Sequence, residues 1–186
     1  MTPGLLIETA RLRLRCLRDD DLADLVRLIG NWEVTRWLAA VPYPYTETDG
    51  REFLALMRQD HATGRPQRFT LALRETDGLI GGVGLDGSRG DGSNEPALGY
   101  WIGQPYWGNG YAREAVAAII DYGFQTLGLQ TIRAYTDPAN TASQKVLLSC
   151  GLAPVGDIEL SKPTRNGAQR APLFRIAAPG ASAKAR

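Results

Sequence analysis

An apolar segment at residues 96–102 leads, through a turn with two glycines, into the longest amphipathic segment of the chain at residues 111–127. Within the second segment, apolar residues recur three and four positions apart, which is the spacing of one buried helix face. Gly128 follows directly, and glycine commonly ends a helix. The stretch therefore predicts a strand, a tight turn and a long helix in immediate succession.

Shorter patterns on both sides predict the rest of the fold. Further strands are expected at residues 12–16, 69–73, 79–85, 129–136, 153–160 and 173–177. Helices are expected at residues 22–29, 32–38, 46–59 and 142–150. Because the helices are few and lie between strands, this order predicts an α+β fold with a mixed, mostly antiparallel central sheet of about six or seven strands, flanked by helices.

The composition narrows the possible partners. With 186 residues, of which 44% are hydrophobic and 22% charged, the chain has the size and balance of one globular domain. Its formal net charge of +1 provides no electrostatic footprint for nucleic acid. We expect no membrane contact and a cytoplasmic location, because neither a bilayer-spanning apolar run nor a signal peptide is recognised. Two cysteines and one histidine, without metal-ligand spacing, predict no metal site.

Residues 1–186 are expected to form a single domain, with a folded core at about 7–176 and a flexible tail of small and polar residues at 177–186. A polar, glycine-rich loop is expected at residues 88–94. His61 is expected at the exposed end of a helix. The aromatic rings between residues 32 and 45 either fill core or hold an acceptor; they are Trp32, Trp37, Tyr43 and Tyr45.

The turn between strand and helix is suited to bind an anion. The backbone at the helix start carries no bulky side chain at three positions, Gly108, Gly110 and Ala112. Several N–H groups are therefore free to point at one anion. The helix N-terminus adds roughly half a positive charge, and a diphosphate can use many N–H groups at once. The alternative is a plain strand–turn–helix link in which glycine serves tight packing. The residues of the turn leave both interpretations open.

Several motifs in one order resemble a known family. The turn reads Trp107-Gly108-Asn109-Gly110-Tyr111-Ala112, and the strand before it reads Gly99-Tyr100-Trp101-Ile102. Downstream lies Asp137-Pro138-Ala139-Asn140-Thr141-Ala142-Ser143. Over about residues 7–176 the chain is similar to the GCN5-related N-acetyltransferases (GNAT), in particular to the ribosomal-protein N-terminal acetyltransferases of the RimJ/RimL type. Trp107 departs from the Gln or Arg of the family's acetyl-CoA signature, although Trp is usual in this branch.

The resemblance implies a single-domain GNAT fold in which two parallel strands splay apart and form the cleft for acetyl-CoA. The pantetheine arm would lie in that gap, where a main-chain N–H polarises the thioester carbonyl. The residues implied in binding acetyl-CoA are Tyr100, Trp101, Ile102, Trp107, Gly108, Asn109, Gly110, Tyr111, Ala112, Arg113, Asn140 and Ser143.

Asn140 and Ser143 lie three positions apart at the start of a predicted helix, and therefore near one face of it. By resemblance, Asn140 bonds the pantetheine arm and Ser143 lies near the sulfur, where its hydroxyl donates a proton to the departing thiolate. The alternative is helix capping, in which Asn140 or Thr141 accepts hydrogen bonds from free N–H groups.

The general base is the point at which the sequence departs from the branch, which often has Glu where this chain has Ala97. Glu95 lies two residues earlier and therefore on the same strand face. We hypothesise that Glu95 acts as the base through a water molecule. The alternative is a solvated carboxylate at the end of a loop.

These motifs together predict an acetyl-CoA-dependent N-acetyltransferase, in which a primary amine attacks the thioester directly. The acceptor is either a protein N-terminal residue or a small amine or antibiotic. A non-catalytic acyl-CoA-binding module is a further alternative, which Ala97 keeps open. Monomer and homodimer are both compatible with the sequence.

Overall fold

The computed structural model describes residues 5–86 and 95–180. Its strands form one eight-stranded sheet in the spatial order β1-β2-β3-β4-β5-β6-β8-β7. Their bounds are β1 Ile7–Glu8, β2 Leu12–Arg15, β3 Arg68–Leu73, β4 Leu79–Asp86, β5 Ala97–Ile102, β6 Thr131–Tyr135, β7 Ala153–Glu159 and β8 Arg170–Ala177. The prediction of an α+β fold is confirmed. The expected number of strands was too low, because the two-residue β1 is too short to show an alternating pattern.

The helices follow the predicted order. They are α1 Leu22–Ile29, α2 Trp32–Thr35, α3 Glu47–Ala62, α4 Tyr111–Gln125 and α5 Thr141–Ser149, with the short 3₁₀ helices η1 Asp19–Asp21 and η2 Gln104–Tyr106. The helix expected at residues 32–38 ends early, at Thr35. The N–H groups of Trp37 and Leu38 donate to carbonyls three residues back instead of four, which converts the last turn to 3₁₀ geometry.

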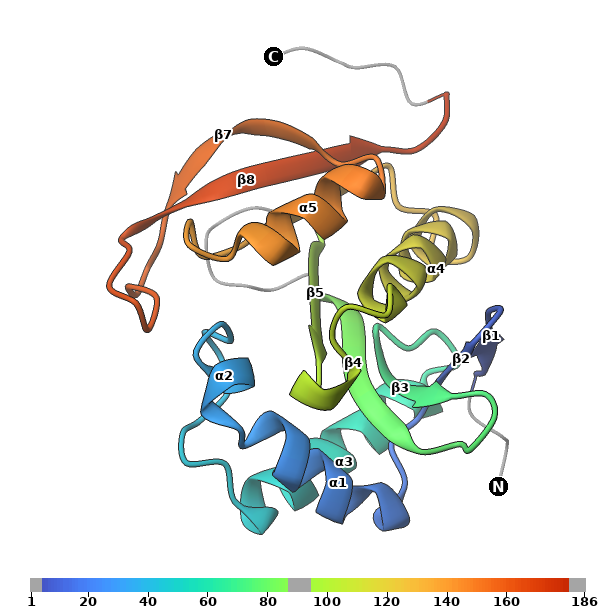
Figure 1. Cartoon of the computed structure of the whole chain (residues 1–186). Helices are drawn as coiled ribbons and strands as arrows, with labels where there is room; N and C mark the ends of the chain where they lie inside the picture. The colour runs from blue at the N-terminus through green and yellow to red at the C-terminus, as the bar shows by residue number, and fades with distance from the viewer. Residues whose placement is uncertain (1–4, 87–94, 181–186) are drawn as a thin grey trace.

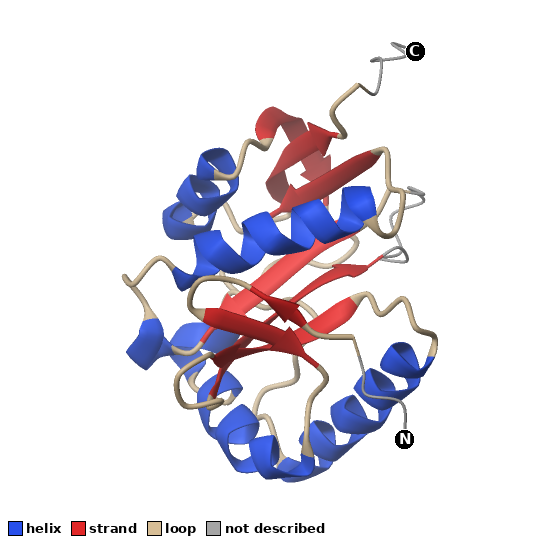
Figure 2. Ribbon diagram, turned by 90° about the vertical axis from the view of Figure 1, so that its right-hand side faces the viewer, coloured by secondary structure: helices blue, strands red, loops and turns tan. Residues whose placement is uncertain are grey.

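Helices cover both faces of the sheet (Figure 1, Figure 2). Helices α1 and α3 pack on one face, against β4 and β3, and α4 packs on the opposite face. Alternate residues of β5 supply both cores. Leu98 and Ile102 belong to the cluster under α4, whereas Trp101 packs against the cluster formed with α1 and α3. Strand β5 therefore lies between the two layers, at the centre of the molecule.

Strands β5 and β6 run parallel, and every other neighbouring pair in the sheet is antiparallel. Within the described residues, the parallel pair is in register only where Ala97 lies opposite Arg133. Beyond that point β5 continues to Ile102, while β6 ends at Tyr135. The predicted splayed pair of parallel strands is thus present, and it opens toward the start of α4.

His61, which was expected to be exposed, is buried, with 7% of its surface accessible. The prediction was wrong because the last turn of α3 packs onto the start of β3 and does not extend into solvent. His61 Nε2 lies 2.8 Å from the carbonyl oxygen of Arg68, and the imidazole meets the Phe69 ring edge-on at 5.2 Å. Burial lowers the pKa of His61 below its ordinary value.

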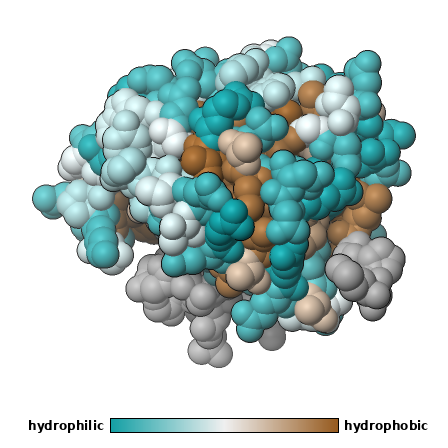
Figure 3. All heavy atoms as spheres, turned by 90° about the horizontal axis from the view of Figure 1, so that it is seen from below, coloured by the Kyte–Doolittle hydropathy of each residue, from teal (hydrophilic) through white to brown (hydrophobic). Residues whose placement is uncertain are grey.

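The loop expected at residues 88–94 lies outside the described residues, as does the last part of the expected tail, 181–186. The first residue of that tail, Ala177, is the end of β8. In the part of the chain that the structure describes, no helix is long and apolar enough to cross a membrane. Seen from the side of α1 and α3, the surface is largely hydrophilic, with hydrophobic residues visible between the polar ones (Figure 3).

Candidate active site

The turn between β5 and α4 has the backbone shape that its glycines require. Gly108 and Gly110 both have φ of +78°, a left-handed conformation that side chains with a Cβ rarely adopt. The Asn109 side chain turns back and donates hydrogen bonds to the carbonyl oxygens of Tyr106 and Trp107, at 3.2 and 3.1 Å. The Trp107 indole donates to the carbonyl of Ile102 at 2.7 Å. The side chains of Trp107 and Asn109 therefore stabilise the turn by hydrogen bonds to the carbonyl groups that precede it.

The opposite side of the turn presents main-chain donors. Among the described residues, no acceptor is found for the N–H groups from Gly108 to Arg113. The first N–H groups of a helix have no partner within the helix, and here the glycine turn extends that row backward by three residues. A row of convergent N–H groups at a helix N-terminus is a site for an anion with several oxygens.

Glu114, in the first turn of α4, ties this helix to the N-terminal segment. Its Oε1 accepts hydrogen bonds from the Thr9 hydroxyl at 2.6 Å and from the main-chain N–H of Arg11 at 2.7 Å, and its Oε2 accepts one from the Arg11 side chain at 2.7 Å. Burial raises the pKa of Glu114, but these hydrogen bonds outweigh it, so that the pKa lies below its ordinary value. These partners lie more than a hundred positions away, so no local pattern in the sequence indicates them.

A second set of main-chain donors lies in the gap between β5 and β6. Gly103 N–H donates to the carbonyl of Ile80 in β4, so the alternation of an antiparallel pair directs the N–H groups of Tyr100 and Ile102 toward β6. The described pairing with β6 ends before these residues, at Ala97. The N–H groups of Tyr100 and Ile102 therefore point into the gap, close to the point where β5 leads into the turn.

Tyr100 of β5 and Ser143 of α5, 43 positions apart in the chain, meet on the face of the sheet that α4 covers. The Tyr100 hydroxyl lies 2.8 Å from Ser143 Oγ and 3.3 Å from the Ser143 carbonyl oxygen. Burial raises the pKa of Tyr100 to about 12, outweighing the hydrogen bond with Ser143, so the phenol is protonated at neutral pH. The sequence indicated both residues but not their contact. The structure brings together two hydroxyl groups that can pass a proton.

Asn140 caps α5, as the alternative interpretation expected. Its Oδ1 accepts a hydrogen bond from the Ser143 N–H at 3.1 Å. The loop before it is fixed by Asp137, whose carboxylate accepts hydrogen bonds from the Ala139 N–H at 2.8 Å and from the Asn166 side chain at 3.1 Å. Asn140 thus positions Ser143 directly. Capping occupies its side-chain oxygen, and contact with a ligand through the amide nitrogen stays a prediction.

The two candidate positions for a base differ in their surroundings. Ala97 is 1% exposed and lies within the sheet. The Glu95 carboxylate accepts hydrogen bonds from Thr131 at 3.2 Å through Oε1 and from Arg175 at 2.8 Å through Oε2. Glu95 is therefore not a freely solvated carboxylate but part of an ion pair that links the start of β5 to β8.

Trp101, on the opposite face of β5 from Tyr100, occupies space that Gly82 leaves open. A Cβ at Gly82 would lie 2.7 Å from the indole nitrogen of Trp101. In the aromatic segment at residues 32–45, Trp32 and Tyr43 form an exposed ring pair at 4.9 Å, with 40% and 49% of their surfaces accessible. These two rings are not core, whereas Tyr45 packs against the cluster under α1 and α3. Of the four aromatic residues, Trp32 and Tyr43 thus lie at the surface, Tyr45 contacts the core and Trp37 is half-buried.

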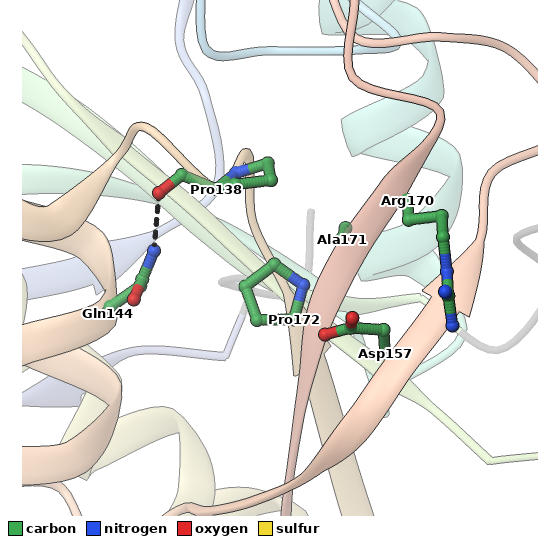
Figure 4. A pocket seen from close by; sticks show the side chains of 6 residues that line it. All are labelled: Pro138, Gln144, Asp157, Arg170, Ala171 and Pro172. Atoms are coloured by element: carbon green, nitrogen blue, oxygen red, sulfur yellow. Dashed lines mark hydrogen bonds between the residues drawn. The ribbon is translucent and has the colours of Figure 1, made fainter.

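A shallow pocket of about 290 Å³ opens beside the start of α5 (Figure 4). Its lining residues are Pro138, Gln144, Asp157, Arg170, Ala171 and Pro172. Gln144 donates a hydrogen bond to the Pro138 carbonyl across one wall at 2.9 Å. None of these residues belongs to the turn, so the row of N–H groups lies on open surface outside this pocket.

Comparisons with known proteins agree with this geometry. The acetyltransferase (GNAT) domain model matches residues 11–153. The N-acetyltransferase p20 of Bacillus licheniformis, itself uncharacterised, is 34% identical over 144 residues, which cover 76% of this chain and 78% of that protein. In p20, as in this chain, the similarity spans most of the protein.

Two solved structures share the fold. A Vibrio cholerae protein assigned as a ribosomal-protein-serine acetyltransferase is 27% identical, with a TM-score of 0.74 and coverage of 96% of this chain and 100% of that one. RimJ of Mycobacterium smegmatis, in complex with CoA-disulfide, is 21% identical, with a TM-score of 0.73 and coverage of 90% of this chain and 82% of that one. Because the GNAT model matches well over half of its residues, the chain belongs to the GNAT family of acetyltransferases.

Proposed function

We propose that this chain is an acetyl-CoA-dependent N-acetyltransferase of the RimJ/RimL type that acetylates a primary amine. The observation that carries the proposal is the row of N–H groups from Gly108 to Arg113, which have no acceptor among the described residues. The pyrophosphate of the acetyl donor fits this row. The pantetheine arm then lies between β5 and β6, and the thioester lies near Tyr100 and Ser143.

The groups at the gap account for the transfer. The N–H groups of Tyr100 and Ile102 are available to polarise the thioester carbonyl, as an oxyanion hole does. The amine nitrogen forms a bond to the carbonyl carbon, and the bond from that carbon to sulfur breaks. Ser143, hydrogen-bonded to the protonated Tyr100, supplies a proton to the departing thiolate. A thiol with a pKa of about 8.5 leaves readily, so this assistance is modest.

The proton lost by the amine is assigned to Glu95 through water. The Glu95 carboxylate accepts one hydrogen bond from Thr131 at Oε1 and two from Arg175 at Oε2, at 3.1 and 2.8 Å. Glu95 lies five residues before Tyr100, roughly 16 Å along an extended strand, so the proton would pass along more than one water molecule. Glu95→Gln is expected to lower kcat at least tenfold. An unchanged rate across the pH profile would remove Glu95 from the mechanism.

The acceptor we favour is a protein N-terminal residue. Support comes from the names of two structural relatives, a ribosomal-protein-serine acetyltransferase and RimJ. An exposed ring pair, Trp32 with Tyr43, offers a surface for a peptide. A small amine is the alternative, because a structure of the same fold is named a microcin C7 self-immunity acetyltransferase.

A thiol-release assay tests the proposal. Acetyl-CoA is offered with a panel of N-terminal peptides, including those of ribosomal proteins, and with small amines and amino acids. CoA release with peptides is the expected result. Release with small amines alone would mean that the acceptor is a small amine. CoA binding is measured in parallel. Binding without release by any acceptor would identify a non-catalytic acyl-CoA-binding module.

A further inference from the structure

Arg11 reaches the turn from a distant part of the chain. It lies between β1 and β2, yet its Nη1 donates a hydrogen bond to the carbonyl oxygen of Asn109 at 2.8 Å. Its Nε donates to Glu114 at 2.7 Å, and its guanidinium lies over the Tyr111 ring at 4.7 Å. These contacts, with Asn109 in the turn and with Tyr111 and Glu114 at the start of α4, fix the plane of the Arg11 side chain.

The remaining nitrogen of Arg11 is placed at the row of N–H groups. Nη2 lies 3.5 Å from the point where a Cβ on Gly110 would sit. Among the described residues, no hydrogen-bond acceptor is found for Nη2, and 48% of the Arg11 side chain is accessible to solvent. Gly110 has no side chain that would separate this nitrogen from a ligand bound along the turn.

The charge of the turn explains why a guanidinium there matters. Residues 107–112 include no basic side chain, so apart from Arg113, which follows them, the turn itself offers only partial charges to a diphosphate. A guanidinium presents donors in a fixed fork, which suits phosphate oxygens. Glu114 occupies one edge of the fork and holds it in place, while Nη2 is left for a second acceptor.

We propose that Arg11 is a phosphate-binding residue of the acetyl-donor site, with Nη2 donating to the pyrophosphate while Nη1 and Nε hold the turn. The inference rests on the proposed function, because it takes the acetyl donor to be acetyl-CoA. It adds a residue from the N-terminal segment to a site otherwise built from β5, α4 and α5.

The test compares Arg11→Gln, Arg11→Lys and the control Arg74→Gln in the full chain. Arg74 is also about half exposed and binds the same segment, donating to the carbonyl of Thr9 at 2.9 Å, but none of its hydrogen bonds reaches the turn. Arg11→Gln is expected to raise the Kd for CoA, and the KM for acetyl-CoA, about tenfold or more. Arg11→Lys should recover part of this loss, and Arg74→Gln should bind CoA as the wild type does.

A donor without phosphate separates a loss at the pyrophosphate site from a general loss of structure. With S-acetyl-pantetheine, Arg11→Gln should match the wild type in kcat/KM, because that donor lacks the pyrophosphate. An unchanged Kd for CoA in Arg11→Gln, or an equal loss with S-acetyl-pantetheine, would overturn the role of Arg11 while leaving the proposed function intact. A wild-type protein that fails to bind CoA would overturn both.

Discussion

At the scale of single residues, Gly110 is important both for the left-handed conformation of the turn and for access of the ligand to its N–H groups. We predict that Gly110→Val raises the KM for acetyl-CoA about tenfold, because a β-branched residue at φ of +78° strains the turn and displaces its N–H groups. Steady-state kinetics with acetyl-CoA varied at saturating acceptor measures the change. The kcat value should fall less than kcat/KM.

Gly64→Val provides the matched control for this prediction. Gly64 has φ of +75° beside the end of α3, and a Cβ there would meet nothing within 4 Å. The same backbone strain should lower stability in both variants, but only the change at Gly110 should raise the KM. Equal KM values in both variants would mean that the phosphates bind elsewhere.

The contact between Tyr100 and Ser143 predicts a second single-residue effect. Tyr100→Phe removes the hydroxyl that lies 2.8 Å from Ser143 Oγ and leaves the ring in place. We expect kcat to fall about tenfold with little change in the KM for acetyl-CoA, because a general acid that assists an already good leaving group contributes modestly. Ser143→Ala should have a similar effect, and the double variant should add little to either. A normal kcat in both single variants would exclude this proton route.

At the scale of elements, the packing of α3 onto β3 predicts a dependence of stability on pH. Burial lowers the pKa of His61 in the folded protein, so the unfolded chain binds more protons just below pH 6.5. The contribution of His61 is fully present above that pH and is lost as the pH falls. The free energy of unfolding should decrease by up to about 1.4 kcal/mol per pH unit over this range.

His61→Gln tests this assignment, because the Gln amide can still donate to the carbonyl of Arg68 but does not titrate. Urea denaturation at several values between pH 7 and pH 5 measures the slope. The variant should show a shallower slope than the wild type. Identical slopes in the two proteins would mean that other groups cause the dependence.

A buried ion pair joins β2 to the start of α1 and predicts a large loss of stability. Arg15 and Asp21 are 5% and 6% exposed, and the guanidinium donates to both carboxylate oxygens, at 2.7 and 2.9 Å. Asp21→Ala removes the bidentate partner of a buried guanidinium and leaves it the carboxylate of Asp77 and the carbonyls of Cys16 and Asp77, so the free energy of unfolding should fall by about 3 kcal/mol. Asp24→Ala removes an exposed pair with Arg27 and should cost less than about 1 kcal/mol. Equal midpoints of urea unfolding for the two variants would contradict this.

The elements that the sequence predicts well are those whose pattern is local. The alternation in β3, β4 and β5 and the spacing in α4 can each be recognised within one segment, and Gly128, with φ of +73°, marks the end of α4. The strand β1 was missed because two residues are too few to show the alternation of apolar and polar side chains. The burial of His61 was missed because it depends on β3, which follows after a turn and has no local signal in α3.

The same distinction holds within the site: features with a local sequence signal were predicted, and contacts between distant segments were not. The left-handed glycines of the turn follow from their position before a helix. The contact of Tyr100 with Ser143, and the reach of Arg11 to Asn109, depend on how distant segments meet, which spacing alone does not encode. The ion pair of Glu95 with Arg175 belongs to the same class, because it joins the start of β5 to β8.

At the scale of the whole molecule, the two faces of the sheet have different roles in the proposed reaction. Tyr100 and Ser143 lie on the face covered by α4 and α5, and Trp101 lies on the face covered by α1 and α3. The gap where β5 leaves β6 connects the two faces. In the proposed reaction, the acetyl donor fills that gap from the turn, and the amine approaches from the side of Trp101.

In the proposed function, the N–H groups from Gly108 to Arg113 bind the pyrophosphate of acetyl-CoA. Amide chemical shifts of the isotope-labelled full chain, followed by NMR during titration with CoA, test it most directly. The largest saturable changes should occur at these N–H groups and disappear in Gly110→Val. Saturable binding of CoA that leaves these amide shifts unchanged, or no binding at all, would contradict this role of the turn.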